Sequence, residues 1–169
     1  MNRFHRSGWA CACLLIGCVL FLSPVAIGLT DRDFQALNRY QVQAEEAIGQ
    51  GDPNGAALTI GRAALLAAQL GGNSRSKPTN RLEHVLASFY RTQEHTYRAI
   101  ALFQQSGSQP PASRGVCQTL EQGQQQAIHT THLYHTLPLE EKILPTLPQQ
   151  FSEWEEMIQE IKRDLRCVK

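Results

Sequence analysis

Hydrophobic residues recur every three or four positions along most of the chain after residue 29, and runs of alternating β-branched residues are missing. Such spacing gathers apolar side chains on one face of an α-helix. The pattern predicts helices over residues 30–49, 53–70, 80–92, 95–105 and 113–134, and a last helix from Gln149 or Ser152 to residue 166. We therefore expect an all-α fold.

Residues that favour helix starts stand before several of these segments. Their side chains accept hydrogen bonds from first-turn N–H groups, and an acidic residue three positions later, or a proline in the first turn, strengthens the signal. The expected starts are Thr30 with Asp33, Asp52 with Pro53, Asn80 with Glu83, and Ser152 with Glu155.

The beginning of the chain has a different pattern, because no charged residue occurs from Trp9 to Leu29 while Arg3 and Arg6 precede this run. A helix of this length matches the hydrocarbon core of a bilayer. Basic residues on its amino-terminal side favour export of everything that follows. We expect a signal peptide or transmembrane anchor over residues 1–29, and an exported body that is periplasmic or membrane-anchored.

Three fates of this segment stay open. Ala26 and Gly28 form a cleavage site of small residues for a secretory signal peptide. The full length of the run suits a retained membrane anchor instead. Cys18 ends a Leu-Ile-Gly-Cys segment similar to a bacterial lipobox, which makes lipidation the third alternative.

The overall composition narrows the function classes. The 169 residues suffice for one domain and a targeting segment, and the 42% of hydrophobic residues excludes a disordered polymer. A net charge of +1 argues against binding to nucleic acid. Nucleophile-elbow, zinc-protease, phosphate-loop and dinucleotide motifs are missing, and so is any CxxC pair. We therefore expect no enzyme and no cofactor.

Three histidines invite a comparison with metal sites. His129, His132 and His135 are three residues apart, so neighbouring imidazoles stand about 60° apart around a helix. Two of them can share a metal, but a closed site needs ligands from a second helix. A metal- or haem-binding bundle therefore stays a weaker alternative to the expectation of no metal site.

Two cysteines lie outside the leader, Cys117 near the start of one predicted helix and Cys167 at the end of the next. If these helices are antiparallel, the two ends lie side by side, within the range that a disulfide bridges. Exported domains meet oxidising conditions. The sequence predicts a Cys117–Cys167 disulfide, with two buried and unlinked thiols as the alternative.

An internal repeat provides a family resemblance over residues 33–111. Shifting the first pair of predicted helices by 43 residues aligns small and apolar positions of the second pair. In the second unit, Ala87 and Tyr90 are followed by Ala99 and Phe103, and the unit ends at Pro111. This arrangement resembles the tetratricopeptide repeat, with Glu94 where that family usually has a turn glycine.

The resemblance implies two helical hairpins over residues 30–111, capped by a C-terminal helical hairpin over residues 112–169. In that family the first helix of each unit lines a concave face that binds other proteins. The outward polar positions that carry over are Gln41, Glu45, Arg81, His84, Ser88 and Arg91.

The expected function is therefore an exported adaptor for protein partners, in which the two arginines of that face, Arg81 and Arg91, suit acidic segments. The alternative is a small helical-bundle subunit that supports a larger membrane complex and keeps its leader as an anchor.

Overall fold

The computed structural model describes residues 29–72 and 81–167, and these residues form helices without any strand. The α-helices are α1 (Asp31–Gly49), α2 (Pro53–Gly72), α3 (Leu82–Gln105), α4 (Arg114–Thr136) and α5 (Leu147–Asp164), with the short 3-10 helix η2 (Leu139–Glu141) between the last two. The predicted all-α class is confirmed. The apolar helix expected over residues 9–29 lies outside the described residues, except for Leu29.

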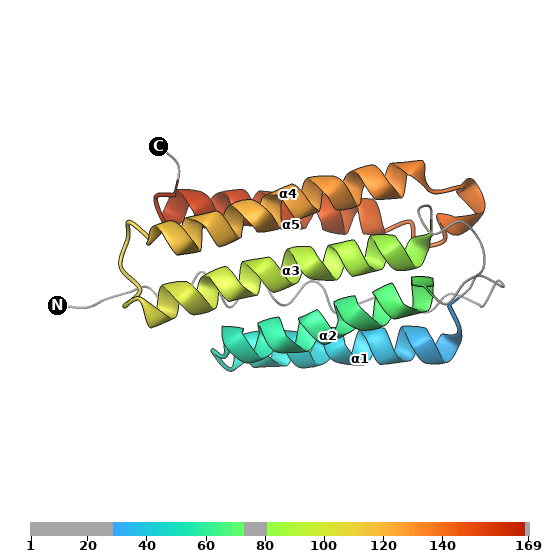
Figure 1. Cartoon of the computed structure of the whole chain (residues 1–169), viewed down its shortest axis with the longest axis horizontal. Helices are drawn as coiled ribbons and strands as arrows, with labels where there is room; N and C mark the ends of the chain where they lie inside the picture. Colours follow the sequence, from blue (N-terminus) through green and yellow to red (C-terminus); the bar gives the residue numbers. More distant parts are fainter. Residues whose placement is uncertain (1–28, 73–80, 168–169) are drawn as a thin grey trace.

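The helices lie in three layers, with α3 in the middle (Figure 1). α1 and α2 form the layer on one side of α3, and α4 and α5 form the layer on the other. The large apolar cluster joins all three layers, because it includes Leu37 of α1, Phe89 of α3 and Phe151 of α5. A smaller cluster around Val116 and Leu120 fills the end of the bundle near the start of α4.

Two of the four predicted helix starts are confirmed, those of α1 and α2. Thr30 and Asp33 form the reciprocal capping box at the start of α1. The Asp52 carboxylate accepts a hydrogen bond of 2.8 Å from the Gly55 N–H at the start of α2. Ser113 accepts from the N–H three residues later at the start of α4. These side chains satisfy first-turn N–H groups that have no partner within the helix.

The prediction of separate helices over residues 80–92 and 95–105 is wrong, because α3 continues through this region. Gln93 and Glu94 stand at the expected turn, and neither is a helix breaker. Thr92 and Thr96 are buried, and each hydroxyl donates to the carbonyl oxygen four residues earlier. The second unit of the predicted repeat is thus one long helix, and the described body has five α-helices where six were expected.

The other two predicted helix caps, at the starts of α3 and α5, are not found among the described residues. The start of α3 has Arg81 as its N-cap without a side-chain cap, and Asn80 lies outside the described residues. The prediction that Ser152 caps the last helix is wrong, since α5 begins at Leu147 and the Ser152 hydroxyl donates to a carbonyl within that helix. A proline in the first turn, Pro148, supports this earlier start.

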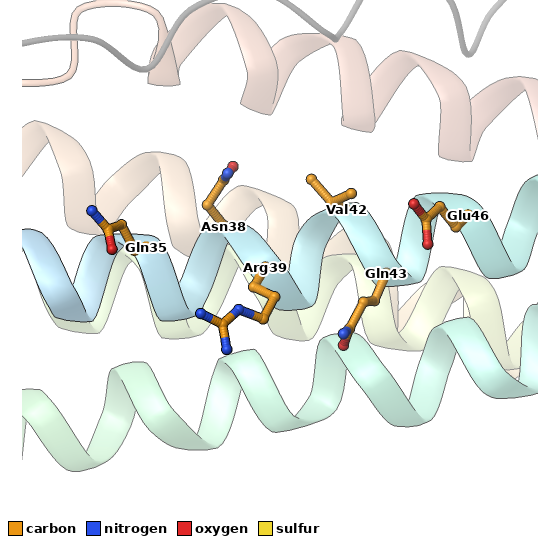
Figure 2. A pocket seen from close by; sticks show the side chains of 6 residues that line it. All are labelled: Gln35, Asn38, Arg39, Val42, Gln43 and Glu46. Carbon is orange, nitrogen blue, oxygen red and sulfur yellow. The ribbon is translucent and has the colours of Figure 1, made fainter.

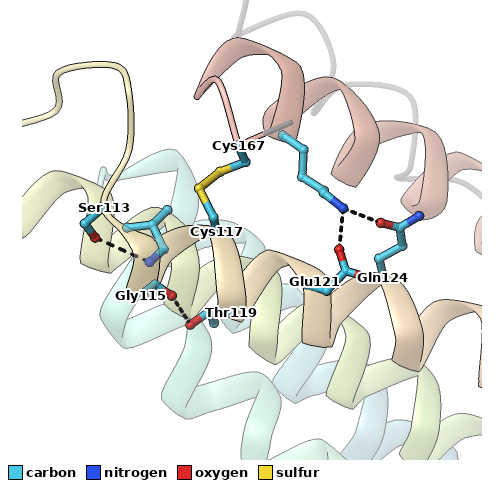
Figure 3. The surroundings of a disulfide bond; sticks show 9 residues. Ser113, Gly115, Cys117, Thr119, Glu121, Gln124 and Cys167 are labelled. Carbon is cyan, nitrogen blue, oxygen red and sulfur yellow. Dashed lines mark hydrogen bonds and ion pairs between the residues drawn. A yellow bond between two sulfur atoms is a disulfide. The ribbon is translucent and has the colours of Figure 1, made fainter. Parts of the chain in front are cut away.

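The predicted disulfide is present, and it joins the start of α4 to the end of α5 (Figure 3). The Cα atoms of Cys117 and Cys167 are 5.3 Å apart. On the same pair of helices, the Lys162 ammonium donates to Glu121 and Gln124, each at 2.6 Å. The two C-terminal helices are therefore linked by a covalent bond and by an ion pair.

Candidate functional site

The residues that the repeat resemblance assigns to a binding face do not share one surface. Gln41 and Glu45 lie on α1, where the Gln41 amide donates to the Glu45 carboxylate at 3.2 Å. Arg81 is the N-cap of α3. The other three residues lie along the first half of that helix, and they are His84, Ser88 and Arg91. α3 is separated from α1 by α2 in the succession of contacts along the bundle.

Ser88 is buried between α3 and α4, so its prediction as an outward position is wrong. Its hydroxyl oxygen is 2.7 Å from the Thr130 hydroxyl and accepts a hydrogen bond of 2.6 Å from the Gln126 amide. A Cβ atom at Gly123 would stand 3.3 Å from the Thr96 hydroxyl. α4 therefore approaches α3 closely along a line of small and hydroxyl-bearing residues, and buried polar groups find partners there.

Arg81 and His84 belong to a polar cluster at the start of α3. The Arg81 Nε atom is 3.9 Å from the carboxylate of Glu83, which is only 1% exposed. Among the described residues, neither oxygen of that carboxylate has a hydrogen-bond partner, and the His84 Nε2 atom has none either. The Glu141 carboxylate of η2 accepts from the Leu82 N–H at 3.0 Å and so serves as the cap that Arg81 lacks.

Arg91 takes part in an ion-pair triad on α3. The buried Glu94 carboxylate is 2.5 Å from Arg91 Nη1 and 2.5 Å from Arg98 Nη2. The two arginines are three residues before and four residues after Glu94, so all three side chains lie on one face of the helix. Their side chains are 40% and 53% exposed, so each guanidinium keeps donors that face solvent.

A glycine on α2 makes room for this carboxylate. A Cβ atom at Gly61 would stand 3.1 Å from both Cδ and Oε1 of Glu94. A Cβ atom at Gly71 would meet Glu83 and His84 in the same way, which shows that α2 and α3 are antiparallel. Residues of α2 from Gly61 to Gly71 therefore lie beside successively earlier residues of α3.

Two exposed leucines flank the glycine that meets Glu94. Leu58 and Leu65 are 58% and 52% exposed, and they stand three residues before and four residues after Gly61 on its face of α2. Because the helices are antiparallel, Leu65 lies toward Arg91 and Leu58 toward Arg98. We call these four residues the leucine–arginine surface.

α2 contributes no acidic group to this surface. Arg62 is the one charged residue within α2, and it is exposed. Burial lowers the pKa of His95, which follows Glu94, while the Glu94 carboxylate acts in the opposite direction. A lowered pKa keeps this imidazole neutral at neutral pH. The surface thus combines leucines and guanidinium groups around one buried carboxylate.

A shallow polar hollow lies on the outer side of α1 (Figure 2). Its described lining consists of Gln35, Asn38, Arg39, Val42, Gln43 and Glu46. The labelled side chains point outward along a single helix, with amides, one cation and one carboxylate mixed together. The apolar contribution is Val42 alone among these six, so the hollow has less to bury than the leucine–arginine surface.

Residues 29–72 and 81–167 contain neither a metal-ligand cluster nor a membrane-spanning helix. No group of three or more His, Cys, Asp or Glu side chains in these segments is placed to hold a metal ion. His129, His132 and His135 are exposed on α4. None of the helices described for this chain is both long and apolar enough to cross a membrane.

The comparisons with known proteins yield no match. No protein-family model, no curated protein and no solved structure matches the chain.

Sequence reasoning missed most of the leucine–arginine surface, although its signals were present. Arg91, Glu94 and Arg98 have the spacing of three and four that joins side chains on one helix face. Leu58 and Leu65 are seven residues apart and exposed, whereas Ala56, Ile60, Ala63 and Ala67 on the same helix are buried.

Proposed function

We propose that this chain is an exported helical adaptor that binds another protein through the leucine–arginine surface and catalyses no reaction of its own. The observation that carries the proposal is the pair Leu58 and Leu65, each more than half exposed, which flank Gly61 where it meets Glu94, the ion-pair partner of Arg91 and Arg98. Exposed apolar side chains that are rimmed by charged groups are typical of protein interfaces.

Two features support export. The uncharged run from Trp9 to Leu29 behind basic residues is typical of a signal peptide or membrane anchor. The Cys117–Cys167 disulfide is the kind of bond that persists outside the reducing cytoplasm. A periplasmic or membrane-anchored location therefore belongs to the proposal, with the helical body outside the cytoplasm.

The resemblance to tetratricopeptide repeats enters the proposal only for α1 and α2. These helices form a hairpin with buried alanines on both sides, Ala44 on α1 and Ala56 and Ala63 on α2. Because α3 is a single helix, a concave face from two successive hairpins is not part of the proposed mode of binding.

A second candidate function is a structural subunit of a membrane complex. The length of the uncharged run favours it, since 21 residues exceed the apolar core of most signal peptides. The amino-terminal sequence of the mature protein separates the two: a retained leader favours the subunit, and a sequence that begins after Gly28 favours the released adaptor. Intact protein in the cytosol with free Cys117 and Cys167 thiols would reject both.

Site-specific photo-crosslinking in the native cells tests the adaptor function. A photoreactive amino acid is placed at Leu58, or at Leu139 on η2 as a control that is 85% exposed and far from α2 in sequence. We expect a reproducible crosslinked partner from position 58 and none of the same mass from position 139. Identical patterns from both positions, or no adduct at all, would reject the proposal.

A further inference from the structure

We propose that the partner segment at the leucine–arginine surface is an amphipathic helix with acidic side chains beside its apolar stripe. This inference rests on the proposed function and adds the chemistry of the partner. It follows from the spacing of the leucines, from the partial exposure of the arginines, and from the lack of acidic residues on α2.

The spacing fits a helix laid along α2. Leu58 and Leu65 are seven residues apart on α2, and Arg91 and Arg98 are seven residues apart on α3. Each pair therefore spans about 10.5 Å along its helix axis. In a partner helix that lies roughly along α2, residues seven apart have the same spacing of about 10.5 Å. Its leucines can therefore contact the two leucines of α2 while its carboxylates contact the two arginines of α3.

The charges select acidic side chains on the partner. Glu94 occupies one donor region of each guanidinium, and its own side chain is enclosed against Gly61. Arginine has five N–H donors, so each half-exposed guanidinium still has donors for a second carboxylate. A basic partner would be repelled by Arg62, Arg91 and Arg98. On α2 and α3 beside these arginines, only the buried Glu94 carboxylate would offset that repulsion.

The same observations make a lipid surface the less suitable occupant. Recognition of anionic lipids generally uses clusters of about four to eight basic residues. The leucine–arginine surface offers two arginines that already share a carboxylate, together with Arg62. The two leucines require a narrow apolar stripe, which a helix provides at the matching interval.

A displayed library of helical peptides probes which side chains the leucine–arginine surface selects. Each peptide has about 18 residues, which is long enough to form a stable helix on binding. Its members carry a leucine stripe, and the positions beside the stripe vary among Glu, Gln and Lys. Selection uses the full-length protein with its disulfide formed. We expect enrichment of Glu over Lys beside the stripe, and direct titration then measures affinity for the strongest selected helix.

Variants test whether this binding uses the surface. Leu58→Ser with Leu65→Ser should weaken the selected helix at least about tenfold. Arg91→Gln should weaken it about threefold to fivefold, while Arg98 still holds Glu94 in place. Glu94→Gln removes the competing carboxylate and should tighten binding, a direction that a purely structural role of the triad does not produce. Leu139→Ser is the matched control and should leave affinity unchanged.

Several outcomes would overturn the inference. They are enrichment of Lys beside the stripe, unchanged affinity in the leucine and Arg91 variants, preferential binding of anionic vesicles through the same leucines, and self-association through them. A specific crosslink from position 58 in cells, combined with any of these outcomes, leaves the adaptor function standing and rejects only the acidic helix. Absence of that crosslink rejects the function itself.

Discussion

Replacing both arginines of the triad with glutamine should destabilise the fold more than replacing the carboxylate that they bind. Arg91→Gln with Arg98→Gln leaves Glu94, which is 3% exposed, without either cation. Breaking a buried pair in this way costs about 3–5 kcal/mol. Since the two arginine side chains are 40% and 53% exposed, water reaches the rim of the site, and we expect about 3 kcal/mol.

Glu94→Gln should cost only about 1 kcal/mol, because both guanidinium groups can turn toward water and the amide keeps the shape of the carboxylate. Urea unfolding of the oxidised protein, followed by circular dichroism, measures both values against a total stability of about 5–15 kcal/mol. Arg62→Gln, an exposed change on α2, is the control and should change stability by less than about 0.5 kcal/mol. If Glu94→Gln and the double arginine variant lose the same unfolding free energy, the reasoning is refuted, because an unpaired buried carboxylate then costs no more than its removal.

The other predictions concern α2, the disulfide and one surface ion pair. Gly61→Ala should lower the melting temperature, because the new Cβ meets the enclosed carboxylate at 3.1 Å, whereas Gly49→Ala, with nothing within 4 Å, should raise it. Cys117→Ser with Cys167→Ser should lower stability by up to about 4 kcal/mol in calorimetry, and an unchanged melting temperature would contradict this. The hydrogen bond and the charge of Lys162 lower the pKa of Glu121. The ion pair therefore stabilises the fold above the pKa of Glu121 in the unfolded chain, and this stabilisation is lost as the pH falls through the lower pKa of the folded state. As the pH falls through the acid range, Glu121→Gln should therefore lose less stability than the wild type, as measured by melting temperatures.

The positions of α1, α2 and α4 and the caps of α1 and α2 were predictable because their signals are local. Thr30 and Asp33 carry a complete capping box in the sequence, and Asp52 before Pro53 marks the start of α2 without knowledge of any distant contact. The predicted break before His95 failed for the converse reason. It came from matching the chain to a repeat, whereas the residues between Thr92 and His95 contain nothing that ends a helix.

The candidate site was less predictable because it depends on which helices become neighbours. Ser88 and Arg91 occur three residues apart on α3, yet one is buried against α4 and the other is exposed beside α2. Periodicity identifies a polar face, but it does not say which part of that face a neighbouring helix covers. The importance of Gly61 likewise follows only from the distance to Glu94, which no sequence pattern states.

The hydroxyl contacts between α3 and α4 have a consequence for how these helices can move. A slide of α4 by one turn would separate Ser88 from Thr130 and Gln126, and it would bring a larger side chain to the place of Gly123 against Thr96. Buried hydroxyls without partners cost about 1–3 kcal/mol each, so alternative alignments of the two helices are strongly disfavoured. The central pair of helices, α3 and α4, is therefore held in a single register.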